Sequence, residues 1–165
     1  MSPVDAVGTA PDHPLLHLGP VSVRAPGVEP RQLDGRFGHL WQWTGDGDPL
    51  LTLVVAVRET RLRTATAAER TLATEVERVR EGYDPDTDVD VRRVRDVEVE
   101  GAAGSAAAVV VGVLDGMAVR NGLVATTDGR HVLVVRLAVA DTDEGTALLG
   151  HVLDDLHLHD WVRPR

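Results

Sequence analysis

The sequence predicts an α+β fold, in which a mostly antiparallel β-sheet is covered by helices on both faces as an α/β/α sandwich. Apolar runs at 50–58, 106–114 and 132–139 lack a polar face. A strand without a polar face lies between two covering layers. Two amphipathic helical patterns follow the earlier and the later strands, and Asp-Gly dipeptides separate the later runs. Such dipeptides are strong hairpin signals, so the pairing is expected to be antiparallel.

The N-terminal half is expected to begin with a flexible tail at 1–14, which is rich in Pro, Gly and Asp. Residues 15–160 then form a single α+β domain, a size that can bury a core. We predict a first strand at 15–23 and a loop at 31–38. A hairpin follows, with strands at 39–44 and 50–58 joined by a Gly- and Asp-rich turn.

The first helix is predicted from its capping signals. Thr66-Ala-Ala-Glu69 matches a capping box, Gly82 suits a left-handed C-terminal position, and Pro85 prevents continuation. The stripe expected to face the core consists of Ala68, Leu72, Val76 and Val79. The face expected to meet solvent carries Glu75, Glu77, Arg78, Arg80 and Glu81.

The second half is predicted to be a meander closed by a helix. Residues 89–99 alternate valines with charges, but the phase slips, which indicates either a bulged strand or two short strands. Gly101 to Gly104 forms a turn of small residues. Strands at 106–114, 117–126 and 131–139 are joined by Asp115-Gly116 and Asp128-Gly129. The last helix starts near Asp141 or Thr142 and runs to about His157.

This element order, the turn Gly101-Ala102-Ala103 after the charged strand and the helix directly after the last strand resemble the PsbP-like fold family. That family includes DcrB and LpqN lipoproteins and chaperones that load effectors for type VI secretion. The resemblance covers about residues 15–158 and implies a non-catalytic binding or assembly module. The chain departs from the lipoproteins because it has no cysteine for a lipobox, and we expect no signal peptide, since residues 1–14 have neither a basic region nor an apolar run.

Composition excludes several classes of partner. The net charge of −9 opposes binding to nucleic acid or to an anionic membrane surface, since both require clustered cations. The chain has no cysteine, and no apolar run reaches the roughly 20 residues of a membrane span. We therefore expect no membrane insertion and a cytoplasmic location.

Candidate chemistry is sparse. Ser105 lacks a nucleophile motif, and no phosphate-binding loop is present. The best metal candidates are His157 and His159, with His151 nearby. Leu156 and Leu158 alternate with the first two, which is typical of an amphipathic chain end. We favour that interpretation and expect no catalytic residue, no metal and no cofactor.

The aromatic residues provide the best binding hypothesis. His39, Trp41 and Trp43 share one face of a single predicted strand, in a chain with only five Phe, Trp and Tyr residues. They either fill the core beneath a helix or anchor an interface or pocket. Our prediction is an adaptor or chaperone-like module that holds a protein partner. The alternatives are a small-molecule or lipid carrier with a pocket between the sheet and the first helix, and an enzyme that uses His and Asp. A homodimer is compatible with each of them.

Overall fold

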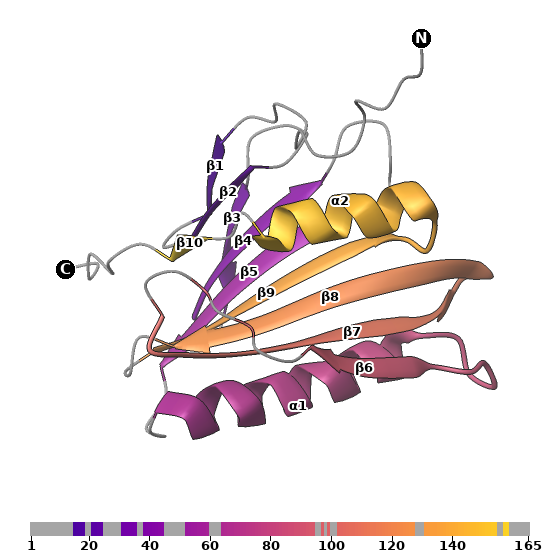
Figure 1. Cartoon of the computed structure of the whole chain (residues 1–165), viewed down its shortest axis with the longest axis horizontal. Coiled ribbons are helices and arrows are strands. Elements are labelled where there is room, and N and C mark those ends of the chain that lie inside the picture. Colours follow the sequence, from indigo (N-terminus) through magenta and orange to yellow (C-terminus); the bar gives the residue numbers. More distant parts are fainter. Residues whose placement is uncertain are drawn as a thin grey trace, which may run out of the picture.

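The computed structural model describes residues 15–18, 21–24, 31–35, 38–44, 52–59, 64–94, 97, 99, 102–127, 131–154 and 157–158. Most of the described side chains lie within 66–94, 102–127 and 131–151. In these parts the chain forms a seven-stranded sheet, a three-stranded sheet and two helices (Figure 1).

The large sheet is antiparallel throughout, with the order β3-β4-β5-β9-β8-β7-β6. Its strands are β3 (Arg31–Gly35), β4 (Gly38–Thr44), β5 (Thr52–Glu59), β6 (Asp90–Val94), β7 (Gly104–Leu114), β8 (Met117–Thr127) and β9 (His131–Ala140). The small sheet contains β1 (Leu15–Leu18), β2 (Val21–Arg24) and β10 (His157–Leu158). The antiparallel α+β class predicted from the sequence is confirmed.

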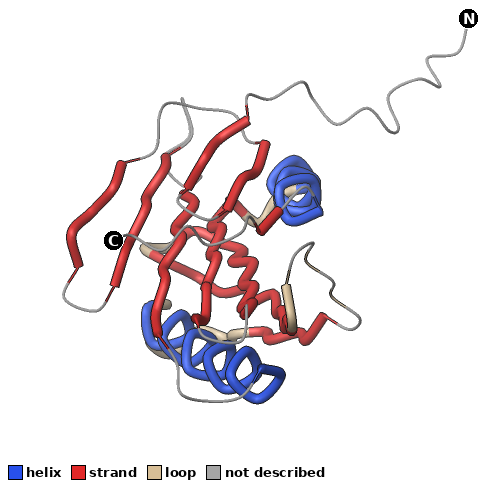
Figure 2. The backbone as a smooth tube through the Cα atoms, turned by 90° about the vertical axis from the view of Figure 1, so that its left-hand side faces the viewer, coloured by secondary structure: helices blue, strands red, loops and turns tan. Residues whose placement is uncertain are grey.

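The two helices lie on opposite sides of the large sheet (Figure 2). Helix α1 (Thr64–Gly82) contacts mainly β7 and β8, whereas α2 (Asp143–Asp154) contacts β9, β8 and β2. The predicted stripe of α1 is buried against the sheet. The buried cluster contains Ala68, Leu72, Val76, Val79, Tyr83, Ala106, Ala108, Val110, Val119, Leu123 and Ala125.

The meander is confirmed, with pairing between β7 and β8 and between β8 and β9. Asp115 and Gly116 join β7 to β8 and have φ angles of 50° and 78°, as a type I′ hairpin turn requires. The second Asp-Gly pair, at 128–129, lies outside the described residues. Of the strands predicted to be buried on both faces, β9 is so over 132–135 and half-buried at 136, 138 and 140. Strand β7 departs from the prediction, because its α2 side is only half-buried from Val109 onward, and the side chains of β5 lie outside the described residues. Strand β8 is buried on both faces from Asn121 to Thr127.

Two strand predictions and the predicted end of the last helix are corrected. The expected loop at 31–38 contains β3, which pairs with β4 at the edge of the sheet, where a strand needs no continuous apolar face. The expected first strand is two strands, β1 and β2, on either side of Gly19-Pro20. The last helix ends at Asp154, and His157 belongs to β10.

The predicted features of α1 also need correction. Thr66 is the third residue of the helix and is not its cap, because the helix begins at Thr64. Gly82 has no positive φ; the left-handed residue after the helix is Asp86, at 63°. Glu75 is only 8% exposed, because its position lies on the buried stripe between Leu72 and Val79.

Candidate binding face

The three predicted binding residues lie in β4, an inner strand between β3 and β5. His39 is opposite Val57 of β5, Trp41 is opposite Val55, and Trp43 is opposite Leu53. Because alternate residues of a strand share a face, positions 39, 41 and 43 share one face of the sheet. Their side chains lie outside the described residues, so their role as binding residues stays a prediction.

The strand register identifies this face. Trp41 is opposite Val55, Val55 is opposite Val135, Val135 is opposite Val124, and Val124 is opposite Ala107. Residues directly opposite each other in neighbouring strands have side chains on the same side of a sheet. The α1 side of β7 is formed by the alternate residues, including Ala106 and Ala108. Positions 39, 41 and 43 therefore belong to the opposite, α2 side.

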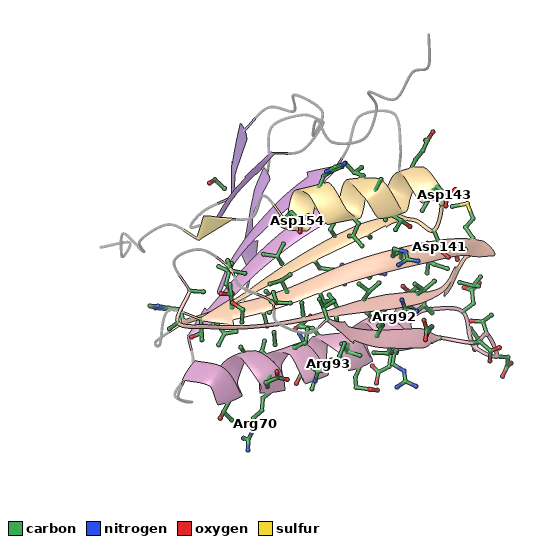
Figure 3. All side chains as sticks on the ribbon, viewed as in Figure 1. Arg70, Arg92, Arg93, Asp141, Asp143 and Asp154 are labelled. Carbon is green, nitrogen blue, oxygen red and sulfur yellow. The ribbon has the colours of Figure 1, made fainter. Side chains whose placement is uncertain are left out.

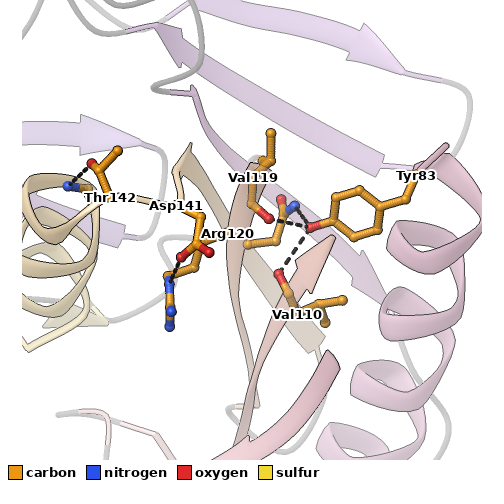
Figure 4. A network of polar contacts seen from close by, with 8 residues as sticks. Tyr83, Val110, Val119, Arg120, Asp141 and Thr142 are labelled. Atoms are coloured by element: carbon orange, nitrogen blue, oxygen red, sulfur yellow. Dashed lines mark hydrogen bonds and ion pairs between the residues drawn. The ribbon is translucent and has the colours of Figure 1, made fainter. Parts of the chain in front are cut away.

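Helix α2 is held over this side by polar contacts at its start. Thr142 caps the helix, because its hydroxyl oxygen accepts the N–H of Gly145 at 3.1 Å. Asp141 accepts from the Nε of Arg120 on β8 at 3.0 Å (Figure 4). The predicted start near Asp141 or Thr142 is thus confirmed. In the sheet order, β4 lies two strands beyond β9, the strand that α2 contacts most.

A buried polar cluster closes the α1 side of the sheet, and sequence reasoning missed it. The side-chain amide of Asn121 donates to the Tyr83 hydroxyl oxygen at 2.6 Å. That hydroxyl also donates its single proton, which is shared between the carbonyl oxygen of Val110 at 3.0 Å and that of Val119 at 3.1 Å (Figure 4). The signal available in the sequence was that Tyr83 and Asn121 are the only residues of their types.

Gly112 makes this cluster possible, because a Cβ at that position would lie 2.6 Å from Cδ2 of Tyr83. The ring of Tyr83 therefore packs directly on the backbone of β7. Burial raises the pKa of the Tyr83 phenol above its usual value of 10.0, while the hydrogen bond from Asn121 opposes that shift. The cluster ties the end of α1 to the hairpin of β7 and β8 and is built for stability.

The histidines considered as metal ligands lie in different places. His157 is in β10 opposite Ser22, His151 is exposed on α2, and His159 is outside the described residues. Among the residues whose positions are described, no group of three or more His, Asp or Glu side chains is arranged to hold a metal ion.

An open hollow of 440 Å³ lies beside the end of β6. Its lining consists of Glu69, Arg93, Val94, Val97, Ser105, Ala106 and Ala107. The ion pair between Arg93 and Glu69, 2.9 Å long, borders the hollow, and both side chains are about half exposed. The hollow is therefore open to solvent and lies at the edge of the sheet.

No protein-family model and no curated protein sequence matches this chain. Neither helix described here has the length and apolar character needed to cross a membrane.

Proposed function

We propose that the chain is a non-catalytic protein-binding module, adaptor or chaperone-like in its role, which holds a protein partner on the α2 side of its sheet. Its binding residues are His39, Trp41 and Trp43, and its architecture is a sandwich of the PsbP-like type. The observation that carries the proposal is the strand register, which aligns all three positions on one side of the sheet.

The position of α2 supports this proposal. The helix contacts β8 and β9, so the part of the same face formed by β4 lies to one side of it. Two indoles on one strand concentrate a large contact area at low conformational cost, and tryptophan is enriched among the residues that dominate binding energies.

The way the buried polar groups are used supports a non-catalytic role. Tyr83 and Asn121 bond to each other, and Tyr83 bonds to the backbone. Thr126 accepts a hydrogen bond from the Ser105 hydroxyl at 3.2 Å. These groups make their hydrogen bonds inside the fold, where they hold strands and helix together.

The carrier alternative is less well supported. It requires an enclosed apolar cavity between the sheet and the first helix. In the described part of the chain, that space is filled by the side chains of the buried cluster between α1 and strands β7 and β8. The open hollow beside β6 is bordered by an exposed ion pair, which does not suit a lipid.

The test is quantitative capture of cross-linked partners from the producing cells, with the wild-type chain and with the Trp41→Ala, Trp43→Ala double variant as bait. We expect the double variant to lose the partners specific to the wild type while its melting curve is nearly unchanged. Trp161→Ala serves as the matched control and should retain them. Unchanged capture together with a large loss of stability would instead place both indoles in the core.

A further inference from the structure

The outer edge of β6 is open in the described part of the chain. This strand is the last in the sheet order, and all five of its residues are exposed. They include two large apolar side chains, Val91 and Val94, which are 36% and 44% exposed. An edge strand presents unpaired backbone N–H and C=O groups and can pair with another strand.

The three charged residues of β6 differ in whether they form ion pairs. Arg93 lies on the α1 side and forms an ion pair with Glu69. Asp90 and Arg92 lie on the α2 side, two residues apart, and neither has an ionic partner among the described residues. Figure 3 shows Arg92 and Arg93 on this outer strand. Within residues 90–94, the edge therefore carries one negative and one positive charge without an ionic partner on the same side.

We propose that β6 pairs antiparallel with β6 of a second copy of this chain, with Val91 opposite Val91 of the second copy. The two copies are then related by a two-fold axis perpendicular to the sheet, which keeps each face of the sheet on its own side. In this register Asp90 of each copy lies directly opposite Arg92 of the other, so two symmetric ion pairs form.

The charges of β6 favour this register over the registers centred on its other residues. A ladder centred on Asp90 places two carboxylates opposite each other, and ladders centred on Arg92 or Arg93 do the same with two guanidinium groups. Like charges directly opposite each other destabilise a sheet. Only the ladder centred on Val91 has an uncharged pair at its centre and opposite charges on either side.

The position of α1 leaves room for the pairing. Its contacts are chiefly with β7 and β8, so in the dimer the two α1 helices lie on the same side of one continuous sheet, set back from the joint. The dimer does not depend on the proposed binding face, because β6 and β4 lie towards opposite edges of the sheet.

Charge exchange tests the proposal by sedimentation velocity over a wide range of protein concentration. We expect the wild-type chain to dimerise, and Asp90→Arg alone or Arg92→Asp alone to weaken the dimer by roughly tenfold or more, because each places like charges opposite each other. An equimolar mixture of the two single variants should form a heterodimer, since every Asp then faces an Arg. The chain that carries both substitutions should dimerise like the wild type, and so should the control Arg70→Asp.

A wild-type chain that stays monomeric at every concentration would overturn the proposal. So would single variants that dimerise as well as the wild type, or a mixture of them that does not recover the dimer. Circular dichroism confirms that each variant is folded, and the mixture needs only that both single variants are folded.

Discussion

Replacement of Tyr83 by Phe tests how much the buried hydrogen bonds of its hydroxyl group stabilise the α1 side of the fold. The substitution keeps the ring on Gly112 and removes only the hydroxyl group, which accepts from the Asn121 amide at 2.6 Å. Asn121 is 7% exposed, so its amide loses this partner in the interior. A buried polar group without its partner costs about 1–3 kcal/mol. A loss of about 2 kcal/mol lowers Tm by about 4–8 °C in a chain of this size.

Urea unfolding followed by far-ultraviolet circular dichroism measures this loss. A double-mutant cycle with Asn121→Ala should give a coupling energy of about 0.5–3 kcal/mol, because the two side chains share one hydrogen bond. The control Thr74→Ala removes an exposed hydroxyl that bonds only within its own helix, and it should not lower stability. A loss below about 0.5 kcal/mol for Tyr83→Phe would refute the reasoning, since the hydroxyl would then contribute no more than an exposed one.

Three further predictions concern the same region. Gly112→Ala should lower the free energy of unfolding in urea by about 1–3 kcal/mol, because the new Cβ meets the ring of Tyr83. The control Gly150→Ala, where a new Cβ has no atom within 4 Å, should raise it by about 0.5–1 kcal/mol. Equal effects of the two substitutions would contradict the prediction. Asp84→Ala should cost about 1 kcal/mol in the same assay, because its carboxylate accepts the backbone N–H groups of Asp115 and Gly116 at 2.9 Å each; an unchanged midpoint would show that the turn holds without it. Folding raises the pKa of Tyr83, so the folded state holds the phenol proton more tightly than the unfolded state does. The resulting contribution to the free energy of unfolding is complete below about pH 10 and is lost as the pH rises through the raised pKa. Tyrosinate absorbance reports Tyr83 alone, since it is the only tyrosine, and titration at the usual pKa would contradict the prediction.

The antiparallel meander could be predicted because its signals are local. The type I′ turn needs positive φ angles at both of its central residues, and Asp115-Gly116 is one of the few dipeptides that adopt them. The apolar runs on either side have the length of strands. The buried stripe of α1 was equally accessible from its helical spacing.

The misses occurred where tertiary pairing decides the local structure. Residues 31–35 contain one apolar side chain, Leu33, and form a strand because β4 offers them an edge. Glu75 occupies a buried stripe position, which a simple division into apolar and charged residues overlooks. Thr66 and Glu69 match a cap by residue type, but Glu69 pairs with Arg93 of β6 instead.

The candidate site could be predicted only in part. Alternation alone placed positions 39, 41 and 43 on one face of a strand, but which side of the sheet they occupy follows from pairings across β5, β9, β8 and β7. The Tyr83 and Asn121 cluster joins residues 38 positions apart, and no local pattern announces it.

The most direct test of the proposed binding face is the solvent accessibility of its two indoles. In the Trp161→Phe chain, Trp41 and Trp43 are the only tryptophans, so acrylamide quenching of fluorescence reports on them alone. We predict ready quenching and the long-wavelength emission of indole in water. Blue-shifted emission that acrylamide does not quench would place both rings in the core and contradict the proposal.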